Sequence, residues 1–359
     1  MTRLLRAIVD THALRSNLVV VRQRAPGARV MAVVKANAYG HGIVPVALAL
    51  DGADAFAVAR IEEGIALRAA GIRQPILLLE GAFGDAQLAE AAHHDFEVVV
   101  HDPTQIEALE RWRGPHRFVI WIKIDTGMNR LGFRCEEFAR ALERVCTLEI
   151  APLEVRVLTH LACADDLESS MTREQVARFR RLTGALGLAT SIGNSAGLLP
   201  GCAENRGDWV RPGLALYGVS PFPAVPAADF GLIPVMTLQT TVLATRRVPR
   251  GETVGYGATW RAERDSQIAI LAAGYGDGLP RQLADGTPVL VAGKRVPLVG
   301  RVSMDMVAVD VTGVDAVAVG SQAVLWGREL AVEEVAGYAG TIPYELLCGI
   351  SQRVPVELR

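Results

Sequence analysis

Charged side chains directly follow several apolar runs in the first half of the chain. Lys35 ends the run RVMAVV, Lys123 and Arg130 occur in FVIWIKIDTGMNRLGF, and His160 follows VLT. A desolvated lysine can attack a carbonyl carbon and form a Schiff base, and an arginine can hold a carboxylate through two hydrogen bonds. These residues therefore point to carbonyl chemistry, although each alone is also compatible with a surface charge or a structural ion pair.

Two later loops contain groups that suit a phosphate. The segment SIGNSAG supplies Asn194 and Ser195, and VRPGLALYG supplies Gly213. In barrel enzymes the loops after the seventh and eighth strands frequently bind phosphate through backbone N–H groups and hydroxyls. A Schiff-base lysine with a phosphate site fits two classes of enzyme, an aldolase acting on a sugar phosphate and an enzyme that uses pyridoxal phosphate.

The pattern of apolar runs predicts the elements that position these groups. Runs rich in β-branched residues are expected strands, and amphipathic segments between them include expected helices at 104–112, 136–145 and 170–186. The strands are expected to begin near Val30, Ala55, Ile76, Glu97, Phe118, Leu153, Leu188 and Leu214. Such alternation over about 230 residues is typical of an α/β TIM-type (β/α)8 barrel, whose active site lies at the C-terminal ends of the strands.

The sequence changes character after Pro234. Short apolar runs such as LQTTVLATRRV, DMVAVDVT and SQAVLWG are separated by Gly, Pro and Asp turns. We therefore expect a barrel domain over residues 1–233 and a mainly β domain over residues 234–359. The opening segment RAIVDTHAL is expected to be a strand that leads into a helix capped by Asp10 or Thr11, and this strand fits either domain.

Composition and charge argue against several functions. The 37 basic and 39 acidic residues give a net charge of −2, which does not favour nucleic acid or a membrane surface as a partner. No apolar stretch approaches the roughly 20 residues of a membrane helix, and the first residues lack the core of an export signal, so a cytoplasmic location is expected. The five cysteines form no CxxC pair, which argues against a zinc site or a disulfide framework.

Nine segments in register resemble bacterial alanine racemase. They are AVVKANAYGHG, KIDTGMNRLGF, HLACADD, NSAG, VRPGLALYG, VGYGATWRAERDS, GYGDGLPR, VGRVSMDM and IPYELLC. The resemblance implies a (β/α)8 barrel followed by a mainly β domain, and a pyridoxal-phosphate-dependent isomerase. Such an enzyme would interconvert L-alanine and D-alanine through an external aldimine by a two-base mechanism. Its product would supply peptidoglycan synthesis, or it would serve alanine catabolism, and the sequence leaves both roles open.

The resemblance also implies a role for each matching residue of the barrel. Lys35 would hold the cofactor covalently and act as one base. Arg211 would donate a hydrogen bond to the pyridine nitrogen without protonating it, because arginine does not readily lose its proton. The ring would then be a weaker electron sink, which would suppress transamination. The remaining cofactor contacts would be Tyr39, His160, Ser195, Gly213, Leu214 and Tyr344.

Two further groups would come from a partner subunit. In the family, the residue that matches Tyr256 is the second base and the backbone N–H that matches Met304 binds the substrate carboxylate, both across a dimer interface. A homodimer with shared active sites is therefore implied. Arg130 would bind the substrate and favour the ionised form of Tyr256. Lys123 matches a position at which the family tends to carry a carbamylated lysine.

Other functions account for fewer of these residues. A decarboxylase of ornithine or diaminopimelate type would need different motifs around the lysine, and broad-specificity racemases tend to be exported. A non-catalytic carrier of pyridoxal phosphate would resemble the barrel alone. An aldolase would leave Arg211, Tyr256 and the second domain without a role. A preference for alanine over serine or other small amino acids follows only from the resemblance.

Overall fold

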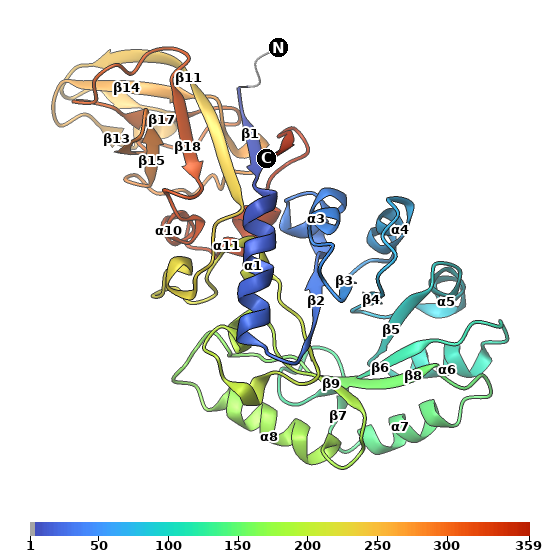
Figure 1. Cartoon of the computed structure of the whole chain (residues 1–359). Helices are drawn as coiled ribbons and strands as arrows, with labels where there is room; N and C mark the ends of the chain where they lie inside the picture. The colour runs from blue at the N-terminus through green and yellow to red at the C-terminus, as the bar shows by residue number, and fades with distance from the viewer. Residues whose placement is uncertain (1–3) are drawn as a thin grey trace.

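Eight parallel strands form a closed barrel in the computed structural model, which describes residues 4–359 (Figure 1). The first three residues of the expected 1–233 domain lie outside the described residues. Strand order is β5-β4-β3-β2-β10-β9-β8-β6, and pairing of β5 with β6 closes the barrel. The expected barrel fold is confirmed. Its strands are β2 (Arg29–Val33), β3 (Ala55–Val58), β4 (Ile76–Leu78), β5 (Phe96–Val100), β6 (Val119–Asp125), β8 (Glu154–Leu158), β9 (Ala189–Ser191) and β10 (Trp209–Val210).

Helices connect the strands and cover the outside of the barrel (Figure 1). The expected helices are confirmed as α6, α7 and α8, with ends displaced by one to three residues. Local sequence explains their starts: α6 begins at Pro103, where a missing N–H costs nothing, and Asp102 accepts the N–H of Thr104. The helices are α1 (Thr11–Arg24), α2 (Lys35–Tyr39), α3 (Ile43–Ala49), α4 (Ile61–Ala69), α5 (Gly84–His93), α6 (Pro103–Arg111), α7 (Phe138–Cys146), α8 (Met171–Thr183) and α9 (Ser195–Leu198).

The prediction of a strand beginning near Leu214 was wrong. That segment is a 3-10 turn, η2 (Leu214–Tyr217), and the eighth barrel strand is β10 instead. The chain leaves the strand because Pro212 has no N–H to donate to a neighbouring strand. The N–H groups of Gly213 and Ala215 donate to Ser195 Oγ, at 3.0 and 3.1 Å, rather than to a strand partner. The apolar run is thus buried as a turn against the barrel.

A second, mainly β domain is confirmed after the barrel. Eight of its described strands share one sheet whose central path is β16-β15-β18-β11-β1-β19, with β14 paired to β11 and β17 paired to β14. The barrel is therefore inserted between two strands of this sheet, because β1 pairs with both β11 and β19. The strands are β1 (Arg6–Val9), β11 (Met236–Val248), β14 (Ser266–Leu271), β15 (Pro288–Val291), β16 (Lys294–Pro297), β17 (Val307–Asp310), β18 (Gln322–Trp326) and β19 (Val356–Leu358).

The opening strand thus belongs to the sheet of the second domain, a point that the sequence left open. It leads directly into α1, whose cap is Asp10: the Asp10 carboxylate accepts the N–H of Ala13 at 3.0 Å. A small hairpin of β12 (Thr253–Val254) and β13 (Trp260–Arg261) and the short β7 (Phe133–Arg134) complete the strands of the described chain.

Two short helices near the C-terminus return to the barrel. After α10 (Val332–Tyr338), α11 (Pro343–Cys348) packs so closely on the turn after β2 that a side chain at Gly40 would collide with the carbonyl of Leu347. The ring of Tyr344 consequently lies 5.7 Å from that of Tyr39, centroid to centroid. In the described part of the chain, none of the helices has the length and apolar character to cross a membrane.

Candidate active site

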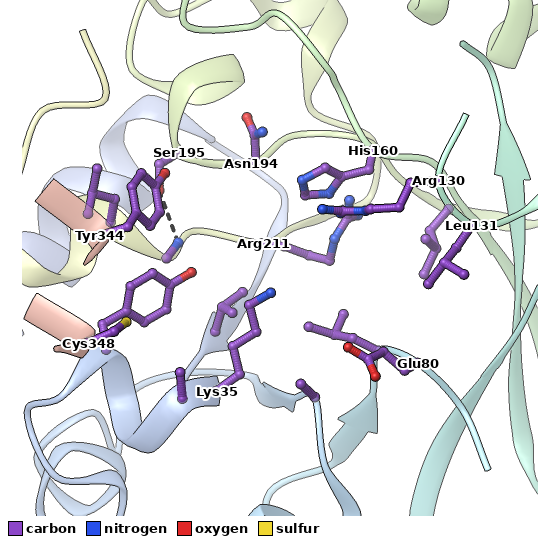
Figure 2. A pocket seen from close by; sticks show the side chains of 18 of the residues that line it. Lys35, Glu80, Arg130, Leu131, His160, Asn194, Ser195, Arg211, Tyr344 and Cys348 are labelled. Atoms are coloured by element: carbon purple, nitrogen blue, oxygen red, sulfur yellow. Dashed lines mark hydrogen bonds between the residues drawn. The ribbon is translucent and has the colours of Figure 1, made fainter. Parts of the chain in front are cut away.

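A cavity of about 470 Å³ opens where the barrel strands end. Its walls contain Lys35 from the turn after β2, His160 from the loop after β8, and Arg211 directly after β10 (Figure 2). The structure brings eleven of the sequence-predicted residues together around this one space. They are Lys35, Tyr39, Lys123, Arg130, His160, Asn194, Ser195, Arg211, Gly213, Leu214 and Tyr344.

The turn that carries Lys35 and Tyr39 is left-handed. Four consecutive residues, Ala36 to Tyr39, have φ between 52° and 54°. For residues other than glycine this conformation is unfavourable by roughly 1–2 kcal/mol each. The turn is fixed by Asn37, whose side chain accepts the N–H of Ile43 at 2.9 Å, and by the N–H of Ala38, which donates to Val34 at 2.9 Å. Strain of this kind is typical of functional sites.

Hydroxyl groups gather on the opposite wall of the cavity. Ser195 begins α9, where Asn194 caps the helix by accepting the N–H of Gly197 at 2.9 Å. Gly213 lies against the hydroxyl of Tyr39 so closely that any side chain there would collide with it. The Tyr344 ring from α11 lies on the same side, next to Ser195 (Figure 2).

Positive charge dominates the interior. Arg211 is buried, and its guanidinium donates to the hydroxyl of Ser191 and to the carbonyl of Thr159. Burial lowers the pKa of Arg211 to about 10, so the side chain remains a cation at neutral pH. Burial, Arg211 and the other nearby cations lower the pKa of His160 to about 2, so its imidazole is neutral.

Lys123 lies at the end of β6 and is almost fully buried. Burial lowers the pKa of its amine to about 8, and the cations Arg211 and Arg130 act in the same direction. A sizeable fraction of the amine is therefore neutral near pH 8. A neutral amine is the form that reacts with electrophiles.

Three residues in or next to this site were given no role by the sequence predictions. Asp125, which lines a neighbouring pocket, accepts the N–H groups of Gly127 and Asn129, both at 3.0 Å, and so fixes the loop that carries Arg130. An Asp before Gly and Asn is a typical turn signal and indicates this role. Glu80 follows β4 and pairs with Arg60 at 3.2 Å, and Cys348 enters the cavity wall from α11.

Tyr256 and Met304 do not line this chain's own cavity. They belong to the second domain, and their side chains are 66% and 53% exposed. Two other large apolar side chains of that domain, Tyr275 and Met306, are also exposed. The single chain therefore separates these two predicted residues from the eleven that line the cavity.

A barrel with a lysine, buried cations and hydroxyls at its strand ends has the kind of site that enzymes use to bind small anionic molecules, and sequence comparison narrows the possible functions. The family model described as "Alanine racemase, N-terminal domain" matches residues 9–221, and "Alanine racemase, C-terminal domain" matches residues 235–358. The chain therefore belongs to the alanine racemase family. It is an enzyme, an amino-acid racemase.

Known relatives match the chain over nearly its whole length. The alanine racemase of Aeromonas hydrophila subsp. hydrophila is 49% identical over 351 residues, which is 98% of each chain. The biosynthetic alanine racemase from Pseudomonas aeruginosa has a solved structure with 41% identity, complete coverage of both chains and a TM-score of 0.96. The alanine racemase from Bartonella henselae, described with covalently bound pyridoxal phosphate, has 31% identity, complete coverage of both chains and a TM-score of 0.91.

These relatives favour one of the reactions that the residue types left open. The matches cover the barrel and the second domain alike, so a protein that resembles the barrel alone is excluded. They support racemisation of alanine rather than an aldolase or decarboxylase reaction.

Proposed function

We propose that this chain interconverts L-alanine and D-alanine by a two-base mechanism, with pyridoxal phosphate held in the barrel cavity. The observation that best supports the proposal is that Lys35, the cationic Arg211 and the hydroxyl of Ser195 line the same cavity. The covalently bound pyridoxal phosphate of the Bartonella henselae relative supports Lys35 as the attachment point.

The residues present fit this cofactor. Pyridoxal phosphate has a dianionic phosphate, an aromatic ring and an aldehyde, and the cavity offers hydroxyls, buried cations and an amine for these parts. Gly213, where no side chain fits, would let the backbone approach the phosphate. Tyr39, Ser195, Leu214 and Tyr344 complete the proposed phosphate contacts. When bound, pyridoxal phosphate delocalises the electron pair left after the α-proton of an amino acid is removed.

Side chains of the protein then move the protons. Lys35, once its amine is free, takes or returns the α-proton on one face, and Tyr256 of a second copy serves the other face. The neutral imidazole of His160 would lie beside the cofactor and would add no charge to the site. Arg130 and the backbone N–H of Met304 from the second copy hold the substrate carboxylate.

A homodimer follows from this assignment. Tyr256 and Met304 lie outside their own cavity and are exposed in the single chain, together with Tyr275 and Met306. Tyr275 lies beside Met304, since its N–H donates to the carbonyl of Ser303 at 3.0 Å, and neighbouring exposed apolar side chains mark interaction surfaces. We assign the cofactor lysine to the barrel, which lies within the expected domain of residues 1–233, and the groups offered to the partner to residues 234–359.

Arg211 is expected to suppress transamination, because a guanidinium cannot protonate the ring nitrogen as a carboxylic acid would. Replacing Arg211 with Glu should therefore raise pyruvate formation from alanine, relative to racemisation, by roughly tenfold or more. Arg211→Lys keeps the positive charge and serves as the control. Pyruvate is measured after long incubation, and circular dichroism confirms folding. An Arg211→Glu variant that folds and forms no additional pyruvate would contradict this role.

Lys123 is proposed to be carbamylated. Because its pKa is lowered to about 8, the neutral amine becomes more abundant as pH rises through 8, and at fixed dissolved CO2 the carbamate should increase with it. The surrounding cations Arg130 and Arg211 would stabilise the new negative charge. A carbon-13 carbamate signal should appear after incubation with labelled bicarbonate and be absent from Lys123→Met. If wild type and Lys123→Met give the same spectrum between pH 7 and 9, Lys123 is unmodified.

The physiological role has two forms, supply of D-alanine for peptidoglycan and catabolism of alanine. The biosynthetic description of the Pseudomonas aeruginosa relative supports the first. Growth of a deletion strain with and without added D-alanine distinguishes them, since only a biosynthetic role makes growth depend on the supplement.

The reaction itself is tested in heavy water. Purified protein with pyridoxal phosphate should convert L-alanine to the racemate and introduce deuterium at Cα, because each inversion replaces the α-proton. Chirality is followed by chromatography and deuterium by mass spectrometry. Protein that binds the cofactor but leaves alanine unchanged would contradict the proposed substrate, and the same assay with L-serine measures selectivity.

A further inference from the structure

One buried residue next to the proposed cofactor lysine has no role in the mechanism above. His41 lies two residues after the left-handed turn of residues 36–39 and is fully buried. Its Nδ1 lies 3.0 Å from the carbonyl oxygen of Ala38 and 2.9 Å from that of Tyr39. Carbonyl oxygens only accept hydrogen bonds, so Nδ1 must carry the proton and donate to both. These carbonyls belong to the last two residues of the turn.

Tyr217 fixes the imidazole from the other side. The two rings are stacked with centroids 4.6 Å apart, and the Tyr217 hydroxyl donates to the carbonyl of Val33 in β2 at 3.0 Å. The Tyr217 ring also lies 4.8 Å from that of Tyr39. We call this pair the His41–Tyr217 bracket. It contacts the chain before Lys35, at Val33, and after it, at Ala38 and Tyr39.

The left-handed turn needs such support. Ala36, Asn37, Ala38 and Tyr39 all carry side chains that disfavour positive φ, so the turn persists only where surrounding contacts fix it. Backbone hydrogen bonds occupy other carbonyls of the turn: Gly40 donates to Ala36 at 3.1 Å and Gly42 to Asn37 at 3.0 Å. The Tyr39 carbonyl depends on the side chain of His41 for its partner among the hydrogen bonds of the described residues.

The charge state of the His41 imidazole also suits a role in holding the turn. Burial lowers the pKa of His41 to about 4, so the ring is neutral at neutral pH. Its Nε2 is buried without a hydrogen-bond partner among the described residues. A neutral ring that donates only from Nδ1 adds no charge beside a lysine.

We propose that His41 is a positioning residue: its Nδ1–H holds the left-handed turn in the conformation that directs Lys35 and the Tyr39 hydroxyl into the cavity. This inference rests on the proposed role of Lys35 as the cofactor lysine. It assigns His41 no contact with cofactor or substrate. Loss of the donor should therefore loosen the cofactor geometry at both its lysine end and its phosphate end.

Three substitutions separate the hydrogen bond from the bulk of the ring. His41→Leu keeps volume without a donor, His41→Asn places an amide N–H near the position of Nδ1, and His41→Gln places it one bond farther away. The dissociation constant of pyridoxal phosphate should rise about tenfold or more in the Leu and Gln variants, because the buried Tyr39 carbonyl loses its partner and the Ala38 carbonyl keeps only backbone N–H donors such as that of His41. It should stay within about threefold of wild type in the Asn variant.

A spectroscopic readout and a control exclude a general loss of stability. The circular dichroism of the bound cofactor reports its orientation and should weaken in the Leu and Gln variants. Phe179→Leu, a buried substitution on α8, should lower the melting temperature without changing either readout. Tyr217→Phe removes only the hydrogen bond to Val33 and provides a second variant if His41→Leu does not fold. It should raise the dissociation constant about threefold.

The outcomes are distinct. The inference is overturned if the His41→Leu variant keeps wild-type cofactor affinity and dichroism. If His41→Leu does not fold, the same result for Tyr217→Phe overturns it. So does a folded His41→Asn variant that behaves like His41→Gln. Borohydride reduction of the wild-type holoenzyme, followed by peptide mass mapping, tests the proposed function separately. A label on Lys35 supports that function whatever the His41 variants do, and a label elsewhere contradicts it.

Discussion

Replacing Lys35 with alanine is expected to abolish racemisation and to let pyridoxal phosphate dissociate during dialysis. The substitution removes both the covalent attachment and the base on one face of the substrate. A positioned acid or base contributes about 10²–10⁴-fold to a rate, and loss of the attachment adds to this, so we expect a fall of at least about 10⁴-fold in kcat/KM. Activity is measured by the appearance of D-alanine, and attachment by the absorbance of the cofactor bound to lysine.

The chain offers a clean control for this variant, because it contains only three lysines, Lys35, Lys123 and Lys294. Lys294 is exposed on β16 in the second domain. Lys294→Ala should keep wild-type activity and absorbance. If the Lys35→Ala protein still shows the absorbance of cofactor bound to a lysine, the attachment point is Lys123, the other lysine of the cavity.

Replacing Tyr256 with phenylalanine should lower racemisation by about 10²–10⁴-fold while leaving cofactor binding intact, because only the acid–base group of one face is lost. Exchange of deuterium into the substrate enantiomer that Lys35 deprotonates should survive, since that face retains its base. The measurement compares deuterium uptake and inversion for L-alanine and D-alanine separately. Equal loss of both processes with both enantiomers would contradict a two-base assignment.

Mixed dimers test whether Tyr256 acts across an interface. If Lys35→Ala and Tyr256→Phe subunits are unfolded together and refolded in equal amounts, half of the dimers are hybrids, and each hybrid has one site with neither substitution. Activity should return to ~25% of wild type. Each variant refolded alone should stay inactive. If the catalytic pair came from one chain, mixing would restore nothing.

The positions of the charged groups were predictable because a barrel directs residues that follow its strands into one space. Lys35, His160 and Arg211 each come directly after an apolar run, and all three line the cavity. The eighth strand was misplaced because LALY is as apolar as a strand, whereas Pro212 and the hydroxyl of Ser195 decide its conformation. Local sequence patterns cannot predict a contact between residues that are distant in sequence.

The left-handed backbone of residues 36–39 could not be predicted from the local sequence either. Alanine favours right-handed helix, so nothing in KANAY indicates four consecutive residues with positive φ. The turn exists because its surroundings fix it, including α11, which arrives from the far end of the chain. For the same reason, the sequence analysis gave no separate role to the donors that stabilise the turn, such as His41. The groups offered to a second copy, Tyr256 and Met304, came from the resemblance alone.

The placement of β1 between β11 and β19 in the second sheet has a consequence for synthesis of the chain. Most neighbouring barrel strands are close in sequence, so the barrel can form while translation continues. The sheet that holds β1 between β11 and β19 cannot be completed until residues 356–358 leave the ribosome. Strand β1 is thus made before the barrel but finds its partners after it. A fragment beginning at residue 234 would lack the strand between β11 and β19, so the barrel and the sheet cannot be separated by a single cut.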